Sequence, residues 1–167
     1  MVNDYNLKTN EITAVIGVLK LNKRPEIKKA INSKVGKRFR KILGKDFRKY
    51  DENQDFLQVP VDDIETEDIS RYFVKVVKFI DTCTKNGRNI VIFCNKGLSR
   101  SPSMILAYLI WKYDIDFEEA KKIVLDVRKR LKINRSFENQ LVEWRIFTSF
   151  NFGFTPKKDV EPKEIYE

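Results

Sequence analysis

Two residues six positions apart, Cys94 and Arg100, have the chemical types and the spacing needed to handle a phosphate group. A cysteine thiolate is a strong nucleophile, and an arginine guanidinium grips two phosphoryl oxygens through its planar fork. A helix is predicted to begin at Ser101 and Pro102, so loop N–H groups and the positive end of a helix dipole would converge on one point. The loop therefore predicts an anion cradle in which a thiolate attacks phosphorus.

The residues around this loop strengthen that interpretation, because the spacing of one cysteine and one arginine is weak on its own. Residues 90–93 are apolar and predict a buried strand directly before Cys94. Gly97 gives the loop room to turn, and Ser99 and Ser101 place hydroxyls on both sides of the arginine. A strand, a glycine-containing loop and a helix start are the parts of a phosphate-binding turn.

Apolar periodicity predicts the other elements that position this loop. Strands are expected at 14–19, 56–61 and 90–93, and helices at about 69–86, 101–113, 117–131 and 136–149. Asp116 and Ser136 are the expected N-caps of the last two helices, and the acids at 65–68 should lie in the first turn of the 69–86 helix. The alternation predicts an α/β fold: a single domain with a central, mostly parallel sheet flanked by helices on both faces.

Two carboxylates are predicted to face the cysteine loop. Asp62 and Asp63 follow the strand at 56–61, and ligands bind at the carboxyl ends of parallel strands. Either carboxyl group could donate a proton to a leaving group, or the pair could form a turn.

Composition limits the function classes. The chain has 167 residues, 42% of them hydrophobic, which fits one globular domain. It contains no histidine, which excludes a Cys-His or Ser-His catalytic pair and removes a common zinc ligand. With two cysteines, no apolar run long enough for a membrane and no secretory signal, we expect an intracellular protein, cytoplasmic or nuclear.

Positive charge is concentrated in residues 20–49. This basic segment holds 13 Lys and Arg against two acids, a net charge of +11, while the whole chain carries +9. It is expected to be helix and loop, either solvated or a patch for RNA, anionic lipid or an acidic partner.

The loop resembles the signature of the cysteine-dependent dual-specificity protein phosphatases. The similarity covers about residues 56–150, and small stand-alone members, poxvirus-encoded ones included, look closest. It is carried by Cys94-Asn95-Lys96-Gly97-Leu98-Ser99-Arg100-Ser101, Val59-Pro60-Val61-Asp62-Asp63, the segment 68–73, the segment 103–109 and the segment 134–144. The resemblance implies a protein-tyrosine-phosphatase-like domain at 1–151, in a host cell if the chain is viral, with a flexible tail at 152–167.

The resemblance also implies roles. Cys94 would form a phosphocysteine, Ser101 would donate to its sulfur, and Asp63 rather than Asp62 would be the general acid. The phosphate would be bound by Arg100 and by loop amides, the set being Asn95, Lys96, Gly97, Leu98, Ser99 and Arg100. Substrates would be proteins carrying phosphotyrosine, phosphoserine or phosphothreonine, with no metal and no cofactor.

One departure from the family is Phe93, which stands where the signature has a histidine. That histidine orders the loop and helps the cysteine to ionise, whereas phenylalanine has no N–H to donate. A second departure is the front of the chain, where the usual strand pair is not evident, so the sheet edge is expected to be shortened. These departures leave open a weak or inactive pseudophosphatase that binds phosphoproteins. An RNA 5′-triphosphatase of the same superfamily and a phosphoinositide phosphatase are further alternatives.

Overall fold

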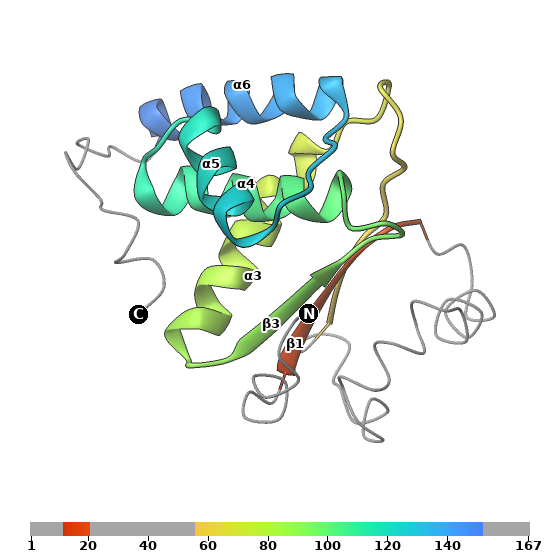
Figure 1. Ribbon diagram of the computed structural model, residues 1–167. Helices are drawn as coiled ribbons and strands as arrows, with labels where there is room; N and C mark the ends of the chain where they lie inside the picture. Colours follow the sequence, from red (N-terminus) through yellow and green to blue (C-terminus); the bar gives the residue numbers. More distant parts are fainter. Residues whose placement is uncertain (1–11, 21–55, 152–167) are drawn as a thin grey trace.

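A three-stranded parallel sheet with helices packed against it forms the frame of the computed structural model (Figure 1), which describes residues 12–20 and 56–151. The strands are β1 (Ile12–Val18), β2 (Phe56–Val59) and β3 (Asn89–Phe93), in the order β2-β1-β3. The sequence predicted all three strands. Of the basic segment at 20–49, only Lys20 lies within the described residues, and the tail at 152–167 lies outside them.

Strand register places the ends of β2 and β3 at one edge of the sheet. Val18 pairs with Val59, and Gly17 pairs with Phe93. Because all three strands run the same way, the residues that follow β2 and β3 emerge together. This is the edge at which the predicted acid pair and the predicted cysteine loop were expected.

The described residues also form four helices. A 3-10 turn, η2 (Ser70–Tyr72), and α3 (Phe73–Lys85) lie between β2 and β3, and α4 (Arg100–Tyr113), α5 (Phe117–Val127) and α6 (Arg135–Asn151) follow β3. In Figure 1 these helices lie on one side of the sheet. Ile16 and Val18 on β1 and Leu57 and Val59 on β2 belong to the same buried cluster as the helix residues. Helices were expected on both faces, and the helix and loop expected in the basic segment lie, apart from Lys20, outside the described residues.

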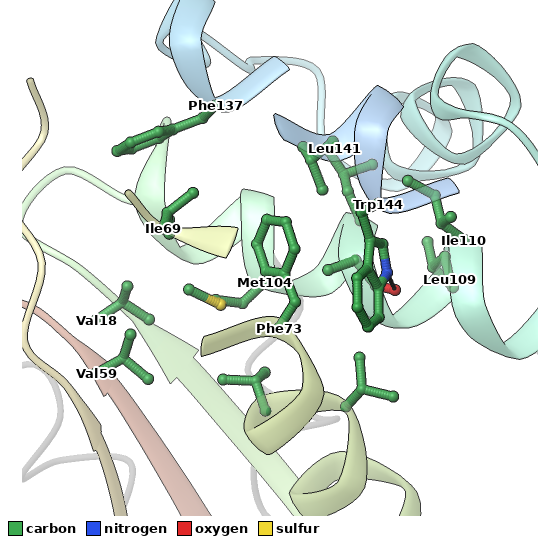
Figure 2. Packing of buried hydrophobic residues seen from close by; sticks show 14 of the residues in the cluster. Val18, Val59, Ile69, Phe73, Met104, Leu109, Ile110, Phe137, Leu141 and Trp144 are labelled. Atoms are coloured by element: carbon green, nitrogen blue, oxygen red, sulfur yellow. Dashed lines mark hydrogen bonds between the residues drawn. The ribbon is translucent and has the colours of Figure 1, made fainter. Parts of the chain in front are cut away.

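The core is built around aromatic residues from α3 and α6 (Figure 2). Phe73 and Trp144 meet edge to face, with ring centroids 5.5 Å apart. The indole Nε1 of Trp144 donates to the Ala107 carbonyl oxygen at 3.0 Å, so the ring is buried without leaving its N–H unpaired. Burying one such large apolar side chain stabilises the fold by about 1.5–3 kcal/mol. These contacts fix α6 across α3 and α4.

Helix ends differ from the expected ones in four places. The acids at 65–68 precede η2 and are not in the first turn of α3. The helix after the cysteine loop includes Arg100, and α5 ends at Val127 because the chain beyond it turns extended. Asn134, not Ser136, caps α6: its Oδ1 accepts the Ser136 N–H at 2.9 Å. The Asp116 N-cap was predicted correctly, with a reciprocal capping box to Glu119.

Candidate functional site

Cys94 is the first residue after β3, and its sulfur is held inside the loop. The residue is 5% exposed. Gly97 N–H donates to Sγ at 3.2 Å, and the Ser101 hydroxyl oxygen lies 3.2 Å from the same sulfur. The sulfur therefore has two polar neighbours, one in the loop and one in the first turn of the following helix, both able to donate to a thiolate.

Gly97 is the residue that lets the loop close on the sulfur. Its φ is +67°, a left-handed conformation that L side chains rarely adopt. A Cβ at this position would stand 2.8 Å from the guanidinium nitrogen Nη2 of Arg128. The backbone conformation favours glycine here, whereas the end of the exposed Arg128 side chain could move aside for a Cβ.

The loop leads directly into the N-terminus of α4. This helix has 14 residues and begins at Arg100, so its first N–H groups have no partner within the helix and its dipole adds partial positive charge near the loop. The Ser99 carbonyl oxygen accepts from both the N–H and the hydroxyl of Ser103 at 2.9 Å, which fixes the first turn. The predicted strand, loop and helix are all present.

Arg100 spans the space between the loop and the segment that follows β2. The residue is 7% exposed, and its Nη1 donates to the Val61 carbonyl oxygen at 3.1 Å. Its Nε is buried and has no hydrogen-bond partner among the described residues. A buried guanidinium N–H without a partner is costly, and an oxyanion held in the loop would satisfy it.

The two predicted acids point to different partners. Asp63 Oδ1 accepts the Ser99 hydroxyl at 2.7 Å, and its Oδ2 lies 3.9 Å from Arg100 Nε. Asp62 Oδ2 instead pairs with Lys20 Nζ at 2.7 Å, away from the loop. The structure thus brings Asp63, and not Asp62, into contact with the loop at 94–100, the predicted phosphate loop.

The segment carrying Asp63, residues 60–68, is anchored by side chains that the sequence analysis did not single out. Glu67 Oε2 accepts the Asp62 N–H at 3.0 Å and pairs with Lys20 Nζ at 3.0 Å. The Asp62 amide and then Lys20 lower the pKa of Glu67, and the hydrogen bonds to Asp62 and Glu67 raise the pKa of Lys20. Glu67 is 9% exposed, so this ion pair is a structural anchor of the segment.

Gln140 on α6 anchors the same segment from the opposite side. Its Oε1 accepts the N–H groups of Ile69 and Ser70 at 2.9 Å, and its Nε2 donates to the Glu67 carbonyl oxygen at 3.0 Å. A sequence signal existed: Gln140 is a polar residue three positions after Phe137 and one before Leu141, on the apolar face of α6. Phe137 and Leu141 themselves are fully buried.

A basic stretch, residues 128–135, runs beside the phosphate loop. The Lys132 N–H donates to the Leu98 carbonyl oxygen at 2.9 Å, and Asn134 N–H donates to Ser99 Oγ at 3.2 Å. These bonds draw the chain away from a helical path after α5. Lys96 on the loop is exposed, as are Lys129 and Arg130 on the stretch, and the Arg128 guanidinium lies beside Gly97, so the loop has cationic side chains near it.

Phe93 packs on the sheet, beside the loop. Its ring lies 3.2 Å from the position that a Cβ on Gly17 would take, and the Phe56 ring lies 3.3 Å from the same point. The ring therefore occupies the space above Gly17. A phenyl ring has no polar hydrogen with which to orient the loop.

No candidate metal centre forms where the structure is described: residues 12–20 and 56–151 hold no group of three or more carboxylate, cysteine or histidine ligands. In the same ranges, no helix combines the length and the apolar character needed to cross a bilayer.

Comparison with protein families gives one match, which runs over most of the chain. Residues 5–147 match the family described as dual specificity phosphatase, catalytic domain. Tyrosine-protein phosphatase vhp-1 of Caenorhabditis elegans is 30% identical over 93 residues, which cover 56% of this chain and 14% of that protein. Dual specificity protein phosphatase 22 of Mus musculus is 28% identical over 114 residues, covering 64% of this chain and 62% of that protein. The chain thus spans less than two thirds of these relatives' length.

Solved structures of similar fold agree with that match. The human tyrosine phosphatase-like serine/threonine/tyrosine-interacting protein superposes with a TM-score of 0.66 at 22% identity, covering 86% of this chain and 82% of that one. Human DUSP28 gives a TM-score of 0.64 at 18% identity, covering 88% and 83%. At these identities the likeness shows the fold, which is the protein-tyrosine-phosphatase-like α/β fold predicted from the sequence.

Proposed function

The chain belongs to the dual specificity phosphatase catalytic domain family, and from this premise we propose that it hydrolyses phosphate monoesters on proteins through a phosphocysteine intermediate. Cys94 is the nucleophile and Asp63 the general acid. Arg100 and the amides of residues 95–100 bind the phosphoryl oxygens. Ser101 stabilises the sulfur as a thiolate.

In the first step, the Cys94 thiolate attacks phosphorus and forms the S–P bond while the P–O bond to the substrate breaks. The departing oxygen takes a proton from Asp63. Negative charge on the equatorial oxygens is balanced by Arg100, whose buried Nε is available for such an oxygen.

In the second step, the Asp63 carboxylate removes a proton from a water molecule, and the water oxygen attacks phosphorus. The S–P bond breaks, inorganic phosphate leaves, and the sulfur departs as a thiolate. The Ser101 hydroxyl, 3.2 Å from the sulfur, donates to it at this point. Asp63 has regained its proton and Cys94 its charge, so the cycle closes.

The surroundings of Cys94 Sγ are the observation that carries this proposal. A buried cysteine with no chemical role would have apolar neighbours. This sulfur instead has the Gly97 N–H and the Ser101 hydroxyl at 3.2 Å, in a loop that opens α4. Such an arrangement stabilises a thiolate and a bound oxyanion.

We propose phosphorylated proteins as substrates, with phosphotyrosine and phosphoserine or phosphothreonine all accepted, in an intracellular setting. The exposed cations around the loop favour substrates with acidic residues near the phosphate. The basic segment at 20–49 would attract an acidic partner of the same kind, while RNA and anionic lipid remain outcomes to be tested.

The test is turnover of p-nitrophenyl phosphate by the wild type, by Cys94→Ser and by Cys83→Ser. Cys83 is the matched control, since it is also a buried free cysteine but lies on α3. Activity in the wild type and in Cys83→Ser, with none in Cys94→Ser, supports the proposal. Loss in both variants, or in neither, contradicts the assignment of the nucleophile.

A phosphoprotein-binding domain without turnover is the second candidate, and Phe93 is the observation that favours it. A phenyl side chain cannot donate a hydrogen bond to the loop, as the signature histidine of the family does. If the wild type binds a phosphotyrosine peptide but hydrolyses neither the peptide nor p-nitrophenyl phosphate, this second function replaces the first. Faster release of phosphate from triphosphate-ended RNA than from phosphopeptides would instead favour an RNA 5′-triphosphatase.

A further inference from the structure

The Ser99 hydroxyl joins three segments of the site. It donates to Asp63 Oδ1 at 2.7 Å and accepts from the Asn134 N–H at 3.2 Å. The residue is 3% exposed, so water does not compete for these bonds. One hydroxyl therefore links the acid segment, the phosphate loop and the stretch before α6.

The direction of these bonds is fixed by their partners. A backbone N–H can only donate, so Asn134 uses a lone pair of the Ser99 oxygen and leaves the hydroxyl proton for Asp63. The Asp63 side chain is 39% exposed and would otherwise turn freely toward solvent. The hydrogen bond at Oδ1 leaves Oδ2 on the side of Arg100 Nε, 3.9 Å away.

This geometry serves both protonation states of the carboxyl group. When Oδ2 carries a proton, Oδ1 is a carbonyl oxygen and still accepts from Ser99. When the proton has gone, Oδ1 is a carboxylate oxygen and accepts a stronger bond. The Ser99 contact can therefore persist while Oδ2 gives its proton to the leaving group and takes one back from water.

We propose that Ser99 is the positioning residue of the general acid: its hydroxyl holds Asp63 Oδ1 so that Oδ2 faces the leaving group. Its hydroxyl binds no phosphate, in contrast to the amides of the loop. This inference rests on the proposed function, because it assigns Asp63 the role of proton donor.

A merely structural hydroxyl has a different kinetic effect from a positioning one. If Ser99 only kept the loop folded, its removal would slow all substrates alike and weaken the binding of phosphate. If it positions Asp63, its removal slows only substrates whose leaving group needs a proton. The two roles separate on a series of aryl phosphates.

The experiment compares wild type, Ser99→Ala, Ser99→Thr and Ser103→Ala on p-nitrophenyl phosphate and on phenyl phosphate, whose leaving group is far more basic. Ser103→Ala is the matched control, because it removes a buried hydroxyl that bonds the Ser99 carbonyl oxygen and not Asp63. We expect Ser99→Ala to lower kcat for phenyl phosphate by about ten- to a hundredfold, the factor of one hydrogen bond to a charged group. The loss on p-nitrophenyl phosphate should be clearly smaller, because p-nitrophenolate leaves without needing a proton, and Ser103→Ala should show no difference between the substrates.

Two further comparisons complete the test. On an Asp63→Asn background, Ser99→Ala should cause no additional loss for phenyl phosphate, because the group that it positions is gone. Ser99→Thr, which keeps the hydroxyl, should retain the wild-type ratio of kcat for the two substrates. This variant still tests the inference if Ser99→Ala does not fold. Equal losses on both substrates, additive losses with Asp63→Asn, or a changed ratio in a folded Ser99→Thr overturn the inference while leaving the proposed function intact. A wild type that hydrolyses neither substrate overturns both.

Discussion

Lys20 and Asp62 form an ion pair of 2.7 Å where β1 and β2 end, and this pair turns Asp62 away from the phosphate loop. The next residue, Asp63, turns toward it. Two adjacent carboxylates, indistinguishable by residue type, are thus separated by their partners: one anchors its segment and the other contacts the loop.

The acid assignment predicts different effects for the two substitutions. Asp63→Asn should lower kcat for phenyl phosphate by about 10²–10⁴-fold, the usual contribution of a general acid, and should affect p-nitrophenyl phosphate less. Asp62→Asn should keep the wild-type dependence on the leaving group, since it loses only an exposed ion pair. A steeper dependence in Asp62→Asn than in Asp63→Asn would show that the assignment is wrong.

Gly97→Ala should lower turnover strongly, because relief of the strain at φ +67° would shift the Gly97 N–H away from Cys94 Sγ, to which it donates at 3.2 Å. Gly87→Ala is the control: its φ is +66°, almost the same, but nothing lies within 4 Å of its Cβ position. Both variants should lose about 1–2 kcal/mol of unfolding free energy from the left-handed backbone. Thermal unfolding and turnover, measured together, separate the shared backbone effect from the effect on the site.

The Glu67 anchor predicts a pH-dependent stability. The pKa of Glu67 is lowered in the folded chain, first by the Asp62 amide and then by Lys20. The stabilisation is therefore fully present above the ordinary glutamate pKa of about 4.3, and is lost as the pH falls through the lower folded value.

Glu67→Gln should accordingly destabilise the protein by about 1–2 kcal/mol at pH 7, the value of a hydrogen bond to a charged group. The difference from wild type should shrink as the pH is lowered below 4. Glu65→Gln, an exposed neighbour on the same segment, serves as the control. Denaturant unfolding at pH 7 and at low pH measures both, and a difference that grows toward acid would contradict the anchor.

Phe93→His should speed the alkylation of Cys94 by iodoacetamide, because an imidazole at this position can donate a hydrogen bond to the loop. One added hydrogen bond of about 0.5–1.5 kcal/mol corresponds to a change of about two- to tenfold in the alkylation rate. The measurement is the rate of alkylation by iodoacetamide against pH, on a Cys83→Ala background that removes the other thiol. Phe93→Leu, which stays apolar, should leave the rate unchanged; equal rates for His and Phe would show that the position has little influence on the sulfur.

Much of this fold could be predicted because its signals are local. The three strands are short apolar runs, and the loop at Cys94 has its glycine, its hydroxyls and its helix start in consecutive positions. The N-cap at Asp116 was likewise visible from Glu119 three residues later. Each of these features is specified by residues close together in the sequence, so the sequence pattern predicts it.

What the sequence did not reveal depends on contacts between distant residues. α5 ends at Val127 because Lys132 and Asn134 bond to the phosphate loop, more than thirty residues earlier in the chain. Lys20 reaches Asp62 and Glu67 across some forty positions, and Gln140 reaches Ile69 across about seventy. Residue type alone did not distinguish these polar side chains from solvated ones.

The three hydrogen bonds that Gln140 makes to residues 67–70 set a lower limit on the part of the chain that can carry the site. A fragment that ends within the first turn of α6 would still contain Cys94, Arg100 and Asp63. It would lack Gln140, so the backbone groups of Glu67, Ile69 and Ser70 would lose their hydrogen bonds to that side chain. Limited proteolysis that cuts after Asn151 should therefore leave an intact site. A cut between Asn134 and Gln140 that removes α6 should free the acid segment and also take Leu141 and Trp144 out of the core, so turnover and thermal stability should be lost together.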